Sequence, residues 1–92
     1  MALRVLCDRE VTDPLLEERL SRIRAQIVAA LALRQMITEL GYDDMPDTLD
    51  LKPLVEYAED RELLHLKAVR TLLYVNGLSN KAKHAIAFRS HV

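Results

Sequence analysis

The longest regular pattern in this chain is a stripe of leucine and isoleucine residues in its first half. Successive members are four, three, four and four positions apart, which places them on one face of an α-helix. They are Leu16, Leu20, Ile23, Ile27 and Leu31. The pattern continues, slightly rotated, to Leu40. Asp13-Pro14 supplies a start signal and Gly41 a stop signal. We therefore predict a helix of about 27 residues, about 40 Å long, which spans the domain and has apolar surface left for a second copy.

The second half carries weaker helical patterns. One helix is expected to begin near Thr48 or Asp50 and to tolerate Pro53 in its first turn. Another covers residues 63–73 and should end at Asn76-Gly77, a turn signal. A last short helix is expected over residues 79–89. The 92-residue chain is thus predicted to be a single all-α domain, a bundle of about four helices.

Residues 1–12 do not fit the helical pattern. Leu3, Val5 and Cys7 alternate with polar neighbours, which is typical of a short strand. A lone strand needs a partner, so a flexible arm or a strand swapped between two copies is an equal interpretation.

Composition excludes several classes of protein. A single cysteine cannot form an internal disulfide, and no apolar stretch has membrane-spanning length, so we expect a cytoplasmic protein that does not enter a membrane. The three histidines and Cys7 lack metal-site spacing, and there is no phosphate-binding glycine loop. No metal or cofactor is therefore expected.

Charge is distributed unevenly along the chain. Residues 39–62 hold nine acidic and two basic residues, a net charge of −7, whereas residues 63–92 hold five basic residues and no acidic one. The overall net charge is −1. Such a chain offers an anionic partner only its C-terminal part, and it can also pair head to tail.

The most conspicuous polar group lies in that basic part. Asn80 and His84 are four residues apart at the expected start of the last helix, so they share a face, with Lys81 and Lys83 beside them. Free backbone amides at a helix start can hold a phosphate, and a histidine can act as a general base. The structural interpretation is that Asn80 only caps the helix and that His84 only bonds a carbonyl.

Short segments of the chain also resemble a known family. The segments are Ala29-Ala30-Leu31-Ala32-Leu33-Arg34, Leu51-Lys52-Pro53-Leu54-Val55, Leu72-Leu73-Tyr74-Val75 and Asn80-Lys81-Ala82-Lys83-His84. Together they resemble HEPN domains, which are compact helical bundles of antiviral, toxin–antitoxin and RNA-processing systems. The likeness is greatest to the uncharacterised HEPN-like group found also in R subunits of type I restriction enzymes. It covers roughly 55 residues, from Ala30 to His84.

The chain departs from this family at one position. Catalytic HEPN ribonucleases carry Arg immediately before the Asn, and two such motifs in a dimer build a metal-independent RNA-cleaving site. Here Ser79 stands where that Arg would be, and a hydroxyl cannot supply the fixed positive charge that stabilises the reacting phosphate. The resemblance implies that Asn80 and His84 are binding residues and that cleavage is lost, unless Arg70 or Arg89 replaces the missing charge.

Three functions follow from these observations. The first is a non-catalytic HEPN-like module in a defence or mobile-element setting, dimeric through the long helix, that binds RNA, a nucleotide or a protein through Asn80, Lys81, Lys83, His84, Arg70 and Arg89. The second is a helix-turn-helix DNA-binding protein that uses residues 63–89. The third is a small phage-type inhibitor or adaptor whose acidic middle imitates nucleic acid or meets a basic partner.

Overall fold

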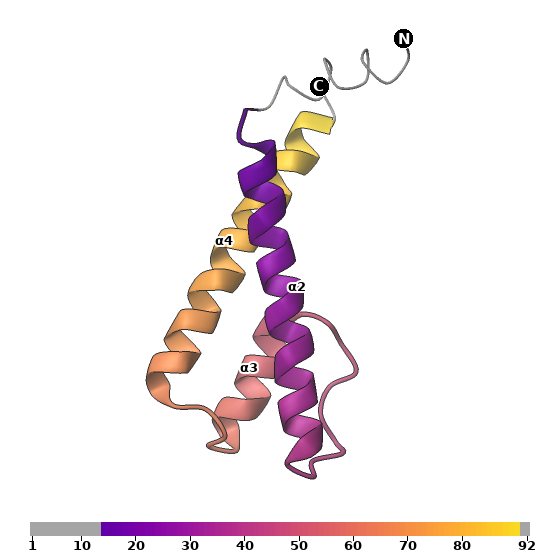
Figure 1. Ribbon diagram of the computed structural model, residues 1–92, viewed down its shortest axis with the longest axis vertical. Coiled ribbons are helices and arrows are strands. Elements are labelled where there is room, and N and C mark those ends of the chain that lie inside the picture. Colours follow the sequence, from indigo (N-terminus) through magenta and orange to yellow (C-terminus); the bar gives the residue numbers. More distant parts are fainter. Residues whose placement is uncertain (1–13, 91–92) are drawn as a thin grey trace.

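The computed structural model describes the backbone of residues 14–90 and the side chains of residues 14–86. Over this part the chain forms three α-helices and no strand: α2 (Leu16–Glu39), α3 (Leu51–Asp60) and α4 (Leu66–Ser90) (Figure 1). The predicted small all-α bundle is confirmed, with three helices in the described part instead of four. The strand or arm predicted for residues 1–12 lies outside the described residues. No helix among the described residues is long and apolar enough to cross a membrane.

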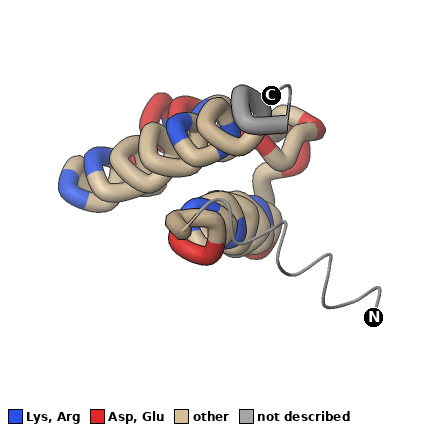
Figure 2. Tube along the Cα trace, turned by 90° about the horizontal axis from the view of Figure 1, so that it is seen from above, with Lys and Arg blue, Asp and Glu red and all other residues tan. Residues whose placement is uncertain are grey.

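The two long helices are antiparallel and the short helix fills the space where they diverge (Figure 1). Each helix contacts the other two. Figure 2, which looks along the molecule, shows α2 nearly end-on and α4 extending away from it at an angle. Consequently only α2 and α4 meet at one end of the bundle, whereas all three helices pack together at the other.

The beginning and end of α2 follow the sequence only in part. Pro14 and Leu15 form a turn before the helix, so Pro14 does not occupy the first helical position as predicted, and Asp13 is outside the described residues. At the other end Gly41 has φ +92° and donates its N–H to the carbonyl of Thr38. Only glycine adopts this backbone conformation without strain, so the predicted stop is confirmed.

The short helix begins as the sequence predicts. Asp50 precedes it in an extended conformation, and Pro53 lies in the first turn, where a missing N–H costs nothing. The apolar residues of α3 are almost completely buried: Leu51, Leu54, Val55, Tyr57 and Ala58. They form the core together with Ala30, Leu33 and Ile37 of α2 and Val69 of α4.

The turn predicted at Asn76-Gly77 is not formed, because α4 continues through both residues. Glycine in a helix interior costs about 1 kcal/mol relative to alanine. The burial of apolar side chains of α4 on both sides of Gly77 stabilises the helix by more than this cost. Val69 and Ala82 are buried on either side, and Asn76 itself is only 9 % exposed. The predicted helix-turn-helix of residues 63–89 is therefore wrong, as is the separate last helix.

The helix α2 does not bury the predicted stripe of residues 16–31, whereas Leu33 and Ile37 of the rotated continuation are buried. Its buried residues are Gln26, Ala30, Leu33 and Ile37. At 100° per residue, this face lies about 90° around the helix from the leucine and isoleucine stripe. Ile27 is 43 % and Leu31 is 51 % exposed. The small Ala30 lies where α2 meets the core, while Ile27 and Leu31 of the stripe are exposed and Leu16, Leu20 and Ile23 are half-buried.

Candidate functional site

A buried polar network joins α2 to the middle of α4. Gln26 is 4 % exposed and donates from Nε2 to Oδ1 of Asn76 at 2.9 Å. Its Oε1 accepts two hydrogen bonds, from Oγ of Ser79 and from Nζ of Lys83, both at 2.7 Å. Residues 76, 79 and 83 recur at helical spacing on one side of α4, which is why a single glutamine reaches all three. No buried polar side-chain atom among the described residues lacks a partner, so this network is fully satisfied.

A small pocket of about 300 Å³ opens beside this network. It lies where the first turn of α3 approaches α2 and α4. Its lining residues are Gln26, Asp50, Lys52, Pro53, Asn76, Asn80 and Lys83. Six of these seven carry polar or charged side chains, two positive and one negative, so the pocket is polar with a net charge of +1.

The two lysines of the pocket have no carboxylate partner. None of the ion pairs formed among the described side chains includes Lys52 or Lys83. A lysine ammonium has three N–H donors, and Lys83 uses one of them for Gln26. The remaining donors are available to a bound group.

Ser79, which was singled out in the sequence, lies in the interface between α4 and α2. Its side chain is 0 % exposed and bonds Gln26 in the interior. A guanidinium at that position would be buried against α2 and would not face a substrate, and a buried unpaired charge is strongly unfavourable. Position 79 is thus a structural one in this chain.

The predicted site residues separate into two groups. Asn80 and Lys83 line the pocket. Lys81, His84 and Arg70 are exposed and lie outside it, and the side chain of Arg89 is outside the described residues. The predicted helix start at Ser79 is wrong because these residues lie within α4, where backbone amides are already bonded. Asn80 therefore does not cap a helix, and His84 is neither buried nor bonded to a described residue.

Four polar residues of the pocket were not predicted from the sequence as site residues. Gln26 is the only buried polar residue of α2, and a lone polar residue within an apolar helical face was the available signal for it. Asn76 was interpreted as a turn residue. Asp50 and Lys52 come from another helix, and their approach to Asn80 depends on tertiary packing.

A second polar cluster fixes the acidic connection between α2 and α3. Tyr57 donates its hydroxyl hydrogen to Asp44 Oδ1, and Arg61 donates to Asp44 Oδ2 at 3.2 Å while its guanidinium stacks 3.6 Å from the Tyr57 ring centre. The hydrogen bond from Tyr57 lowers the pKa of Asp44, and the nearby Arg61 lowers it further. Burial, followed by the bond to Asp44, raises the pKa of Tyr57. Because these groups are paired with one another, the cluster stabilises the connection and offers no free catalytic group.

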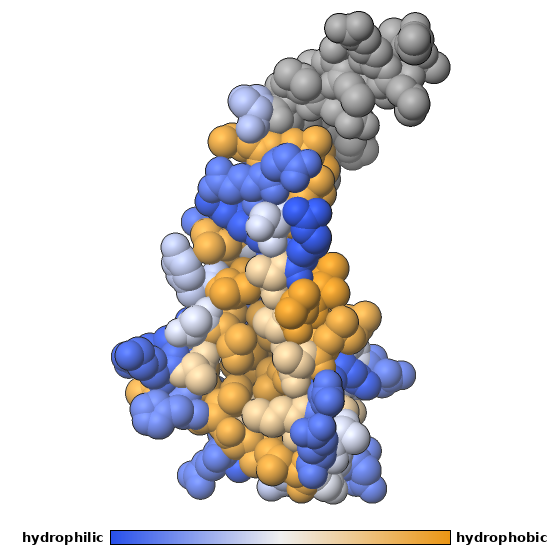
Figure 3. Space-filling model, in the orientation of Figure 1, coloured by the Kyte–Doolittle hydropathy of each residue, from blue (hydrophilic) through white to orange (hydrophobic). Residues whose placement is uncertain are grey.

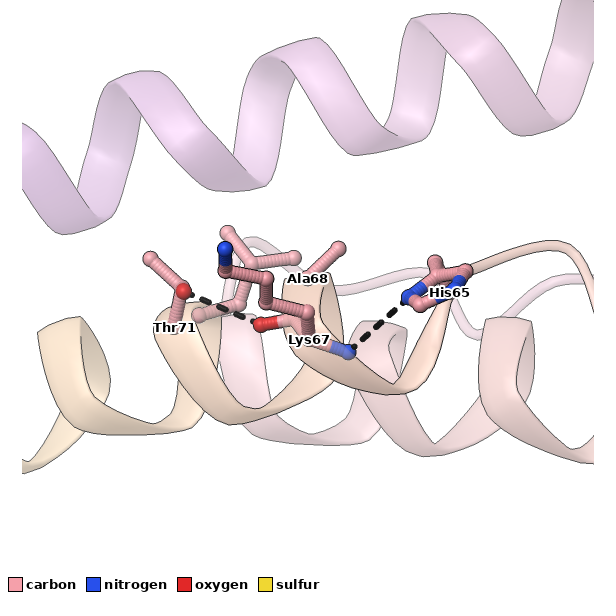
Figure 4. Close-up of a pocket in the computed structure, with 5 residues that line it drawn as sticks. His65, Lys67, Ala68 and Thr71 are labelled. Carbon is pink, nitrogen blue, oxygen red and sulfur yellow. Dashed lines mark hydrogen bonds between the residues drawn. The ribbon is translucent and has the colours of Figure 1, made fainter.

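An apolar groove opens on the first turns of α4. The lining residues are His65, Lys67, Ala68, Thr71 and Leu72, around a volume of about 530 Å³. In Figure 4 their side chains lie between α4 and the ribbon of α2, and the hydrogen bonds drawn run from Lys67 N to His65 Nδ1 and from Thr71 Oγ1 to the Lys67 carbonyl. Figure 3 shows apolar surface along the middle of the face of the molecule that is drawn there, flanked by hydrophilic side chains. No group of three metal-binding side chains occurs among the described residues.

Comparisons with known proteins give no match. No protein-family model matches the chain, and neither a curated protein nor a solved structure is significantly similar to it. The resemblance to HEPN domains therefore stays a prediction, and function is inferred from the residues and their geometry.

Proposed function

We propose that this chain is a non-catalytic HEPN-like interaction module that pairs with a second copy through α2 and binds an RNA or nucleotide partner on its basic side. The observation that carries this proposal is the exposed apolar surface in the middle of α2, formed by two residues of the stripe and the neighbouring Val28. Ile27, Val28 and Leu31 are 43 %, 63 % and 51 % exposed. Burying such side chains is favourable by about 25 cal/mol per Å².

A second copy fits this stripe because both partners would use the same face. The spacing of Leu16, Leu20, Ile23 and Ile27 is that of helices that pair along a heptad seam. A two-fold axis then covers both stripes at once, as in most soluble homodimers.

The size of the stripe sets the strength of the pairing. A 24-residue helix is about 36 Å long and about 10–12 Å wide, which gives a footprint of about 400 Å² per partner. A standard interface buries about 800 Å² per partner. We therefore expect a reversible dimer that dissociates on dilution.

The proposal that the module does not cleave RNA rests on two observations. The position of the catalytic arginine is held by the buried Ser79, and His84 makes no hydrogen bond to a described residue that would orient it. Without a positioned cation, the developing phosphate charge has nothing to stabilise it. Prolonged incubation with single-stranded RNA in chelator should leave the RNA intact, and cleavage that is lost in His84→Ala would contradict this part of the proposal.

Self-association is tested by sedimentation velocity on the full chain over a hundredfold range of concentration. We expect the wild type to shift from monomer to dimer as concentration rises, and Leu31→Glu to stay monomeric. Leu66→Glu is the matched control, because Leu66 is a leucine that is 56 % exposed at the first position of α4 and does not belong to α2. A wild type that is monomeric at every concentration, or equal effects of the two substitutions, would refute pairing through α2.

A second candidate function is the small acidic inhibitor or adaptor. It is favoured by the exposure of the acidic residues that surround α3, which are Glu39, Asp43, Asp44, Asp47, Asp50, Glu56, Glu59, Asp60 and Glu62. Such a surface attracts a basic partner. Binding of the chain to a polylysine peptide together with no binding to RNA or nucleotide would favour this function over the first.

A further inference from the structure

We infer that the pocket formed by Gln26, Lys52, Asn76, Asn80 and Lys83 is a binding site for a phosphate group. The inference deepens the proposed binding function by naming the site and the chemical class of its ligand. It does not depend on dimerisation, because none of the pocket residues belongs to the exposed stripe of α2. A volume of about 300 Å³ lies at the lower limit of small-molecule sites, which suits one phosphate-bearing group.

The pocket is built before any ligand arrives. Gln26 is almost fully buried and holds Asn76, Ser79 and Lys83 through three hydrogen bonds. Since the Gln26 carbonyl oxygen accepts two of these bonds and the Asn76 oxygen accepts the third, the donors of Lys83 and of the Asn76 amide remain for another acceptor. A side chain fixed in this way loses little conformational entropy when it binds.

The groups that remain are mainly hydrogen-bond donors. Lys83, Lys52 and the amide nitrogens of Asn76 and Asn80 all line the pocket or belong to residues that line it. The adjoining first turn of α3 has no side-chain cap. Several donors and two ammonium groups around one small volume are the complement of a phosphate, which is charged and carries only acceptors at its oxygens.

Asp50 is the one anionic group that lines the pocket, so its replacement tests the inference by a change in phosphate affinity of known direction. Its carboxylate makes no capping hydrogen bond to α3, so it does not hold the helix start in place. It repels a bound anion. Asp50→Asn keeps a good residue at the helix start and should therefore strengthen phosphate binding, the opposite of the effect expected at the lysines.

The experiment is a titration of the full chain, followed by amide and side-chain NMR shifts at constant ionic strength. The probes are inorganic phosphate, adenosine monophosphate, a short single-stranded RNA and acetate. Lys83→Met should weaken phosphate binding about tenfold or more, because it removes a charge-assisted hydrogen bond, and Asp50→Asn should strengthen it. Lys81→Met is the control, since Lys81 is exposed on the same helix and does not line the pocket; it should change affinity less than twofold.

The outcomes separate the possible sources of the group. Binding of inorganic phosphate alone, or of the mononucleotide or RNA as well, supports the site if Lys83→Met weakens it and Lys81→Met does not. Equal losses in the two variants would show unspecific attraction to basic residues and overturn the inference, as would acetate binding as tight as phosphate or no binding at all. Lys83→Met also removes the hydrogen bond from Lys83 to Gln26, so Lys52→Met serves as a second variant. Lys52 makes no hydrogen bond or ion pair with a described residue, so replacing it removes none. If the chain stays monomeric but binds phosphate in this pocket, the proposed pairing through α2 is refuted and the phosphate site is not.

Discussion

The replacement Gln26→Leu is the most direct test of the buried network. Leucine has a similar size but no polar atoms, so the substitution removes three hydrogen bonds. Ser79 is 0 % and Asn76 is 9 % exposed, and both lose their bonded partner. Lys83 is exposed and regains water, so it contributes little to the loss.

The magnitude follows from these burial values. A buried polar group left without a partner costs about 1–3 kcal/mol. Two such groups give a penalty of about 2–6 kcal/mol, and the additional apolar burial of leucine offsets about 1–2 kcal/mol of it. The Ser79 hydroxyl can also bond a carbonyl one turn earlier in α4, which reduces the penalty further. We therefore expect the free energy of unfolding to fall by about 1–3 kcal/mol.

The assay is urea denaturation followed by far-ultraviolet circular dichroism at one fixed protein concentration. With a slope of about 1 kcal/mol per molar urea, the midpoint should fall by about 1–3 M. Gln35→Leu is the control: Gln35 lies on the same helix, is exposed and bonds only Glu39, so it should change stability by less than about 0.5 kcal/mol.

A double substitution makes the reasoning refutable. Ser79→Ala removes the hydroxyl that Gln26→Leu leaves unpaired, so Gln26→Leu with Ser79→Ala should lose about 1 kcal/mol less than the sum of the single losses. Strict additivity, or wild-type stability of Gln26→Leu, would show that the glutamine does not hold α4 in the way described.

Two further predictions concern the backbone and pH. Gly77→Ala should raise the free energy of unfolding by about 0.5–1 kcal/mol, because Gly77 is helical with open space around it. Gly41→Ala should lower the free energy of unfolding by about 1–2 kcal/mol through strain at φ +92°. Urea midpoints measure both effects, and destabilisation by Gly77→Ala would favour a turn at Asn76-Gly77 over a continuous helix. Since folding lowers the pKa of Asp44, its contribution is complete above the unfolded value near about 4 and is lost as the pH falls through the folded value. The midpoint difference between wild type and Asp44→Asn should therefore shrink between pH 5 and pH 2.5, and a constant difference would contradict the pairing of Asp44 with Tyr57 and Arg61.

Local chemistry explains which predictions were confirmed. Gly41 ends α2 because only its backbone adopts the required conformation cheaply. Pro53 was expected in the first turn of α3 because the N–H that it lacks has no helical partner there. In both cases the deciding interaction lies within one turn of the chain, so the residue alone carries the information.

The candidate site could be predicted only in part. Asn80 and Lys83 were found because helical spacing groups them with neighbouring charges. Their partners Gln26 and Asp50 are 57 and 33 positions before Lys83 in the sequence, and no periodic pattern connects segments so far apart. His84 shared the pattern, but it is exposed and does not line the pocket.

The sequence by itself determined that this chain is helical, where α2 ends and where α3 begins, since these depend on spacing and on single residues with special backbones. Tertiary structure alone decided which face of α2 is buried and whether α4 continues through Asn76-Gly77. The reason is physical. The sequence of α2 offers two apolar faces, and the sequence of α4 contains a weak turn signal at Asn76-Gly77. Which face is buried, and whether the helix continues, depends on the free energy of contacts between helices. A bond such as that between Gln26 and Asn76 exists only after the helices have met.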